Sequence, residues 1–212
     1  MSVTSVVIGN LYILNYGPDS GWGTSVVLPP SFWAGGTYNQ GTAVAATWNT
    51  DGGDLLLTFS GTISTLGIEG EVRLSPPADN AIAAQVSVTT NGTVELDSRP
   101  GEAFKLVMLS SMHISENNWD AQSAFAEAQT YPLPESGWII DPSVNGTILG
   151  LTGGTSLWKT NAPTVEIVLA QAAQITGWVT GSGDPNDDNL GLWAASDEVL
   201  SDWSYTITTK SP

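Results

Sequence analysis

The stretch TAVAATWNTDGGDLLLTFSGTIS, residues 42–64, decides the fold class. Small or apolar side chains alternate with polar ones in its first part, and NTDGGD in its middle is a run of turn-forming residues. The last part is again apolar and rich in threonine and serine. Two such runs around a short Gly-rich turn are typical of paired antiparallel strands. The stretch therefore predicts a β-hairpin.

Similar short apolar runs, bounded by Gly, Pro, Asn or Asp, recur along the whole chain. They cover residues 6–16, 69–74, 83–90, 93–98, 104–115, 137–140, 146–152, 164–170, 175–180 and 203–208. No long segment with a helical period separates them, and no repeat or linker divides the 212 residues. Strands at this spacing predict one all-β domain over residues 1–212, an antiparallel, jelly-roll-like β-sandwich. We expect the tail, residues 201–210, to close the sheet near the amino-terminal strand.

The segment NNWDAQSAFAEAQTY, residues 117–131, has two interpretations. It could form a helix with Asn118 as N-cap, because Ala, Gln and Glu favour helices. We favour a strand, because helices are scarce elsewhere in the pattern. One face of that strand would carry Trp119, Ala121, Ser123, Phe125, Glu127, Gln129 and Tyr131. In the preceding strand, strict alternation predicts a face with Lys105, Val107, Leu109, Ser111 and His113.

Charge and composition exclude several classes of function. Five basic residues against 21 acidic ones give a formal charge of −16, which repels nucleic acid and anionic lipid. The chain has no cysteine and one histidine, so disulfides, thiolate chemistry and Cys/His zinc sites are excluded. No run is long and apolar enough for a membrane-spanning helix.

The amino-terminal MSVTSVVIGN lacks the basic and apolar regions of a signal peptide. Two Asn-Gly-Thr triplets, at Asn91 and Asn145, are acceptors for N-glycosylation if the chain enters a secretory pathway. Both are also Asn-Gly pairs, which form ordinary β-turns. We expect a secreted glycoprotein whose signal peptide is not part of this sequence.

Nine tryptophans are several times the average usage. Trp48 and Trp178 stand within apolar strand runs, so we interpret them as core residues. Six others lie beside turn-forming residues, where loops on a rigid scaffold carry binding sites. These six are Trp22, Trp33, Trp119, Trp138, Trp158 and Trp193.

Candidate residues for acid–base chemistry and for a metal are weakly marked. The single histidine, His113, is either a structural residue or a proton donor. Two carboxylates for glycoside hydrolysis could be Glu127 with Asp120 or Glu135, although nothing in their spacing marks them. The loop GDPNDDNLG offers Asp184, Asn186 and Asp188 as oxygen ligands for calcium. It lacks the complete EF-hand pattern, and a solvated acidic turn is the alternative interpretation.

The stretch KLVMLSSMHISENNWDAQSAFAEAQTYPLPESGWI, residues 105–139, together with LTGGTSLWKTNAP, residues 151–163, carries a resemblance. It is similar to the cofactor-independent cyclases of natural-product pathways, in particular the hetero-Diels-Alderases of fungal tropolone-sesquiterpenoid pathways. The fold as a whole also resembles Stig cyclases and carbohydrate-binding modules. The amino terminus departs from the Asn-x-Ser-Phe-Glu start of Stig cyclases.

The resemblance implies an enzyme that holds an apolar terpenoid or polyketide in a reactive geometry without a cofactor, although a structural calcium ion is an option. It implies apolar walls from Met112, Trp119, Phe125, Trp138 and Trp158. It also implies donors to a carbonyl oxygen from His113, Gln122, Tyr131 and Lys159.

Two other functions compete with the cyclase. A lectin-like carbohydrate-binding protein would use the indoles as stacking faces for sugar rings. A structural domain would bury every tryptophan in its core. Geometry separates the lectin from the cyclase, because a sugar platform is open and a cyclase pocket is closed and apolar. The sequence leaves the oligomeric state open, a homodimer included.

Overall fold

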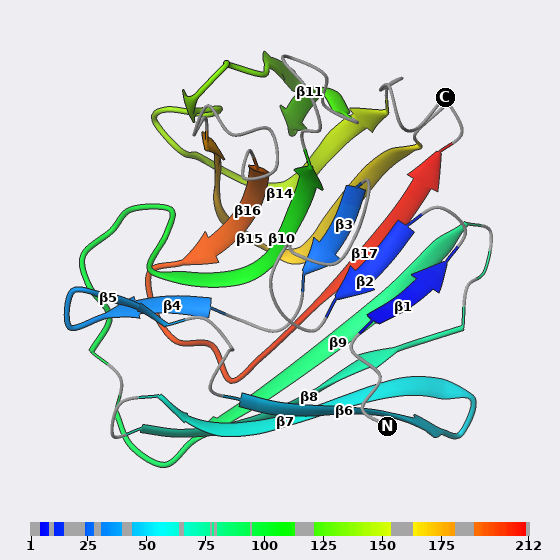
Figure 1. Cartoon of the computed structure of the whole chain (residues 1–212), viewed down its shortest axis with the longest axis vertical. Coiled ribbons are helices and arrows are strands. Elements are labelled where there is room, and N and C mark those ends of the chain that lie inside the picture. Colours follow the sequence, from blue (N-terminus) through cyan, green and yellow to red (C-terminus); the bar gives the residue numbers. More distant parts are fainter. Residues whose placement is uncertain are drawn as a thin grey trace.

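The computed structural model is an all-β sandwich without a helix in its described part (Figure 1). It describes residues 5–8, 11–14, 24–27, 31–39, 44–63, 66–76, 78, 80–93, 95–112, 121–153, 163–180 and 189–210. The predicted fold class is confirmed. Within these ranges, no helix has the length and apolar character needed to cross a membrane.

Strands make up most of the described residues. They are β1 (Ser5–Ile8), β2 (Leu11–Leu14), β3 (Thr24–Val27), β4 (Ser31–Ala34), β5 (Thr37–Asn39), β6 (Val44–Asp51), β7 (Asp54–Ile63), β8 (Leu66–Leu74), β9 (Ala81–Thr90), β10 (Phe104–Met112), β11 (Ala121–Ala126), β12 (Gln129–Pro132), β13 (Gly137–Trp138), β14 (Val144–Gly153), β15 (Thr164–Thr180), β16 (Asn189–Ser196) and β17 (Asp202–Lys210). Their pairing is antiparallel except between β2 and β3, which are parallel.

The predicted hairpin at residues 42–64 is the β6–β7 pair. Its register runs from Val44 opposite Gly61 to Asp51 opposite Asp54. The turn between them has Gly52 and Gly53 at φ angles of 60° and 98°. Such positive φ angles favour glycine, so the turn sequence explains where the hairpin closes.

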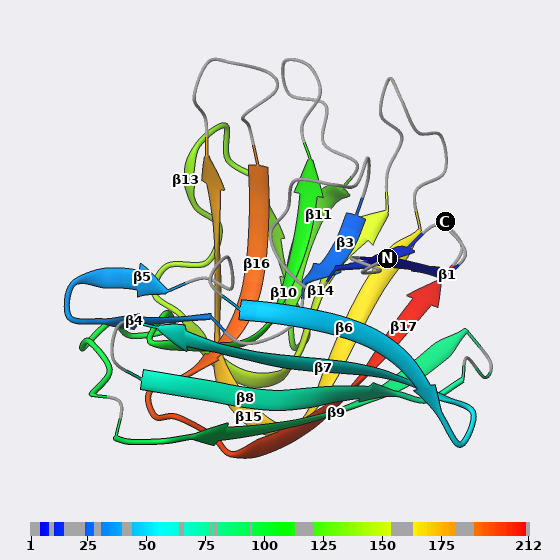
Figure 2. The same cartoon turned by 60° about the horizontal axis from the view of Figure 1, so that its bottom comes forward.

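The strands form two layers around one core (Figure 2). The first layer runs β6–β7–β8–β9–β17–β15–β14–β11–β12, and we call it the lower layer because its part β6–β9 lies at the bottom of Figure 2. The upper layer runs from β15 through β16, β10, β3 and β2 to β1, with β4 extending β10. Side chains alternate between the core and solvent, as in β9, where Ile82, Ala84, Val86 and Val88 are buried.

Three details of the strand pattern differ from the sequence prediction. Residues 95–98, within the expected strand 93–98, form no strand, while β16 was missed because its Gly and small residues resemble a loop. Residues 164–170 and 175–180 are one strand, β15, and not two. The tail, β17, pairs with β9 and β15, whereas β1 pairs with β2.

The ambiguous segment is a strand, as favoured, but it turns back on itself. β11 and β12 form a hairpin around Glu127, whose φ of 53° places it in the turn. Tyr131 is therefore opposite Ala124, on the core side, while Phe125 is on the outer side. The prediction of one continuous face with both aromatic rings is wrong, because a turn residue reverses the alternation.

β10 is central, with β16 on one side and β3 and β4 on the other. A bulge between Lys105 and Val107 shifts the alternation by one residue. Val107 and Leu109 face the core, while Lys105 falls in register with Ala195 on the outer face. The predicted shared face of Lys105, Val107 and Leu109 is therefore wrong.

β15 belongs to both layers. Its first part, Thr164–Leu169, pairs with β17, and its last part, Gln174–Thr180, pairs with β16. β14 follows it through both parts, with a break in register between Gly146 and Ile148. We call this break the seam.

The carboxylate of Glu127 satisfies backbone groups at the seam. It accepts hydrogen bonds from the N–H groups of Thr147 and Ile148, the latter at 3.1 Å. The backbone N–H of Thr147 is the main cause that lowers the pKa of Glu127, followed by that of Ile148. Gly146 permits this approach, because a Cβ atom there would lie 2.8 Å from Glu127 Cγ. Glu127 therefore has a structural role.

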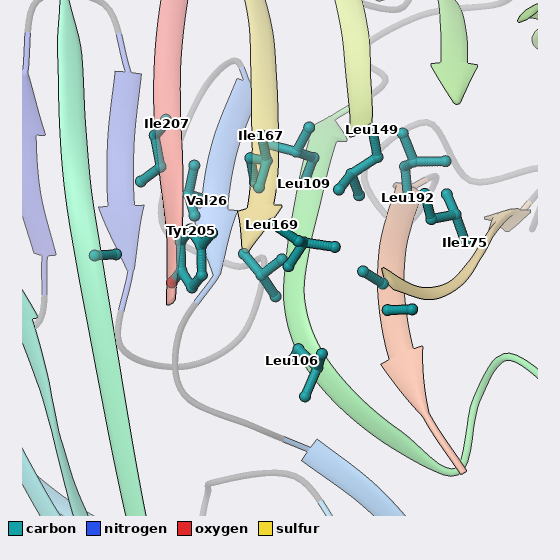
Figure 3. Packing of buried hydrophobic residues seen from close by; sticks show 14 of the residues in the cluster. Val26, Leu106, Leu109, Leu149, Ile167, Leu169, Ile175, Leu192, Tyr205 and Ile207 are labelled. Carbon is teal, nitrogen blue, oxygen red and sulfur yellow. The ribbon is translucent and has the colours of Figure 1, made fainter. Parts of the chain in front are cut away.

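A buried hydroxyl in the core makes no hydrogen bond with a described residue. It belongs to Tyr205, which packs in the same buried cluster as Val26, Leu169 and Ile207 (Figure 3). Burial raises the pKa of Tyr205. On folding, the hydroxyl loses its hydrogen bonds to water, and no described residue replaces them.

Replacing Tyr205 by Phe should raise the free energy of unfolding by about 1 kcal/mol, because the unpaired hydroxyl is removed and the ring stays. Urea unfolding of both proteins measures this. Tyr131→Phe, at a half-buried position, is the control and should change little. A clear loss of stability in Tyr205→Phe would show that the hydroxyl has a partner after all.

Candidate functional site

Three indoles meet on the outer face of the upper layer. Trp138 of β13 is paired directly with Trp178 of β15, and their ring centroids are 5.0 Å apart with an angle of 85° between the planes. The Trp138 ring also lies edge-on to Trp193 of β16, at 6.3 Å and 63°. We call these residues the tryptophan cluster.

Exposure falls along the cluster from the surface inward. Trp138 is 42% exposed and Trp178 is 39% exposed, whereas Trp193 is only 4% exposed. Beyond these two, Val168 is the only other large hydrophobic side chain found exposed among the described residues. Large apolar side chains that stay in solvent side by side are typical of binding surfaces.

Glycines set the position of two cluster members. Gly137, directly before Trp138, has a φ of 101°, which side-chain-bearing residues rarely adopt. Trp193 donates a hydrogen bond from Nε1 to the backbone oxygen of Gly101, at 2.7 Å. Gly101 itself is packed closely, because a Cβ atom there would lie 3.1 Å from Thr176 Cγ2. The buried indole is thus fixed before any ligand arrives.

Lys105 lies at the buried end of the cluster. Its Nζ is 3.6 Å from the centroid of the Trp193 ring, in a cation–π contact. Burial lowers the pKa of Lys105 from 10.5 to about 8, and the nearby charge of Glu102 opposes this only in part. The cation–π contact with Trp193 also favours the charged form of Lys105. Burial therefore lowers the pKa of Lys105 by more than Glu102 and Trp193 together raise it.

A second cation rests on an indole close to Lys105 in sequence. The guanidinium carbon of Arg99 is 3.7 Å from the centroid of the Trp33 ring, and its Nη1 is 3.9 Å from Glu102 Oε2. Glu102 is therefore close enough to act on the charges of both Arg99 and Lys105. With both cations protonated, the three groups carry a net charge of +1.

The outer face of the lower layer has a different character. Two open hollows of about 430 and 480 Å³ adjoin there and share Glu71 and Ser87. Polar groups line most of the smaller hollow, whereas polar and apolar surface are about equal in the larger one. Arg73 beside them is already held by Asp51 and Asp54, at 3.0 and 3.3 Å. Exposed aromatic rings are found in the tryptophan cluster and not among the residues of these hollows.

Of the predicted substrate-binding residues, Trp138 lies in the cluster. Phe125 is half-buried, and its ring covers Gly150, its partner on β14, so it supports the sheet. Met112 is the last residue of β10, and only its backbone is described. Trp119 and Trp158 lie outside the described residues.

Of the predicted catalytic residues, Gln122 is exposed on β11 and Tyr131 is half-buried on β12. The ring contacts of Trp138 are with Trp178 and Trp193, so no described contact joins it to Gln122 or Tyr131. His113 and Lys159 lie outside the described residues, as do the expected calcium ligands Asp184, Asn186 and Asp188. Elsewhere in the described ranges, no three acidic or histidine side chains gather around a point where a metal could bind.

The interpretation of two tryptophans must be corrected. Trp178, expected in the core, is exposed, and Trp193, expected at a ligand surface, is buried. The sequence could have indicated that Trp178 points outward. In a strand, neighbouring residues face opposite sides, and Gly177 and Val179 on either side of Trp178 are buried. Trp193 lies in β16, the strand that the sequence analysis missed.

Both sequon asparagines are exposed, as glycosylation requires. Asn91 lies just after β9, and its side-chain oxygen accepts a hydrogen bond from the Gly67 N–H at 2.7 Å. Asn145 lies within β14, opposite Gln174. The turn interpretation fits Asn91 and is wrong for Asn145.

The chain matches no protein-family model and no curated protein.

The lowered pKa of Lys105 predicts a pH-dependent stability. Between pH 8 and pH 10.5 the unfolded chain binds more protons at this lysine than the folded protein, so folding becomes more favourable as the pH rises. Relative to Lys105→Met, the wild-type protein should gain on the order of 3 kcal/mol across this window. Urea unfolding at several pH values measures the difference.

The matched control is Lys210→Met, because Lys210 is exposed and pairs with Glu166 on the lower layer. Its stability difference from wild type should not follow the Lys105 curve. Parallel curves for wild type and Lys105→Met would show that burial does not shift this amine.

Proposed function

We propose that the protein binds carbohydrate through Trp138 and Trp178. The observation that carries the proposal is the exposure of these two adjacent indoles, 42% and 39%, among described large hydrophobic side chains that, apart from Val168, are buried or half-buried. An exposed indole is costly in water unless a ligand covers it. The C–H faces of sugar rings supply apolar surface that packs against an aromatic face, while their hydroxyls stay in water.

The setting of the cluster supports this class of ligand. Both indoles are more than a third exposed, which suits a ligand with one apolar face and a hydrated rim. The charge of −16 opposes anionic partners and leaves neutral ligands favoured. The exposed asparagines of both sequons support an extracellular setting.

Replacing Trp138 or Trp178 by Ala should lower saccharide affinity about tenfold, because each removes one stacking face worth about 1.4 kcal/mol. Isothermal titration calorimetry against a panel of oligosaccharides measures the loss. Val168→Ala is the control, because it truncates the exposed apolar residue of the lower layer. Wild-type affinity in both tryptophan variants would refute the site, and no binding to any saccharide would refute the function.

The cofactor-independent cyclase is the second candidate. One observation favours it: β10 ends at Met112, which is paired with Asn189, and Asn189 is paired with Thr180, two residues beyond Trp178. Met112, the residue before His113 in the sequence, thus lies at the edge of the layer that also carries the exposed indoles. Apolar walls beside a proton donor are what a cyclisation of a carbonyl-bearing polyene requires.

Under this proposal, the protein should convert a member of a terpenoid and polyketide panel, and His113→Ala should lower turnover without unfolding the protein. Product formation is followed by mass spectrometry, and folding by circular dichroism. Unchanged turnover would remove His113 from the mechanism. Absence of conversion together with saccharide binding would leave carbohydrate binding as the function.

A further inference from the structure

The angle between the exposed indoles limits what can cover both. With their planes at 85° and centroids 5.0 Å apart, Trp138 and Trp178 form a corner. A flat surface can lie against one of these rings but not against both, because their faces point in nearly perpendicular directions. A single ring-shaped unit can enter the corner and touch both indoles.

The corner is held in place from beneath. Trp138 packs edge-on against Trp193, at 6.3 Å, and Trp193 is fixed by its hydrogen bond to Gly101. Trp178 is held by the pairing of β15 with both β13 and β16. Flattening the pair into one plane would break these contacts, so the corner is the geometry that a ligand meets.

The net charge of the protein, and not the few charged groups close to the corner, disfavours an acidic ligand. Arg99 and Lys105 lie near Glu102, and both cations rest on indoles. Lys105 is buried, so it offers little to an anion in solvent. The overall charge of −16 adds repulsion toward uronic acids and sulfated sugars.

We infer that the ligand is a neutral, soluble oligosaccharide, gripped at one sugar ring in the corner between Trp138 and Trp178, and not the flat face of a crystalline polysaccharide. This inference rests on the proposed carbohydrate binding and specifies its ligand. The two indoles enclose one sugar unit from two sides, so affinity depends on their mutual angle as well as on their presence.

The test compares matched probes, soluble and crystalline, on the wild-type protein. Cellohexaose and chitohexaose represent the soluble form, and microcrystalline cellulose and crystalline chitin represent the flat form. Xylohexaose and mannohexaose widen the neutral panel, and a hexamer of galacturonic acid tests charge. Calorimetry measures the soluble ligands, and sedimentation with the solid measures the insoluble ones.

The angle is tested with Gly137→Ala. At a φ of 101° an added Cβ strains the backbone, although it would meet no atom within 4 Å, so the substitution disturbs the position of Trp138 without removing an indole. Gly53→Ala is the matched control, because Gly53 has a φ of 98°, is equally free of neighbours, and lies in the β6–β7 turn. Gly137→Ala should lower affinity about tenfold, and Gly53→Ala should leave it unchanged.

The outcomes separate the two proposals. Binding to a neutral soluble oligosaccharide, with loss in Gly137→Ala alone, supports the inference. Binding only to a crystalline solid, binding best to the acidic hexamer, or equal affinity of Gly137→Ala and Gly53→Ala overturns it while carbohydrate binding stands. Failure to bind any saccharide, soluble or solid, overturns both.

Discussion

The structure depends on one strand that belongs to two layers. β15 runs from Thr164 to Thr180, and its two parts pair with β17 and β16 in turn. A strand that changes layer must leave its ladder for a few residues, and the N–H groups released there need other partners. On the neighbouring strand β14, which shares the break in register, the Glu127 carboxylate accepts hydrogen bonds from the N–H groups of Thr147 and Ile148. An acidic side chain in a turn of another hairpin thus completes the seam between the layers.

The seam also explains where the tryptophan cluster lies. Beyond it, the last part of β15 has the core on one side and an outer face that no further layer covers in the described structure. Alternation places Ile175 and Val179 in the core and Trp178 outside. β13 adds only two residues to this edge, so Trp138 can stand beside Trp178 without a longer strand to cover it. The exposure of the pair follows from the topology.

The sequence revealed the fold class because period-two alternation and Gly-rich turns are local properties. The hairpin at residues 42–64 and the strand at 121–126 could be predicted from them. The changes in alternation could not be predicted, because the bulge at Lys105 depends on the distant strand β16 and Glu127 in its turn is held by Thr147 and Ile148 of β14. The candidate site was only partly accessible for the same reason. Trp138 was singled out, but its pairing with Trp178 depends on the register of β13 against β15.

The scarcity of cations links the cluster to the rest of the molecule. Of the four described basic residues, Arg73 and Lys210 pair with carboxylates on the lower layer. Arg99 and Lys105 instead rest on indole rings. Trp193 therefore supports a buried charge on one side and the exposed Trp138 on the other, so a change at Trp193 would affect stability and site together. Trp138 and Trp178 carry no such charge, and this is why they, and not Trp193, can separate ligand binding from folding.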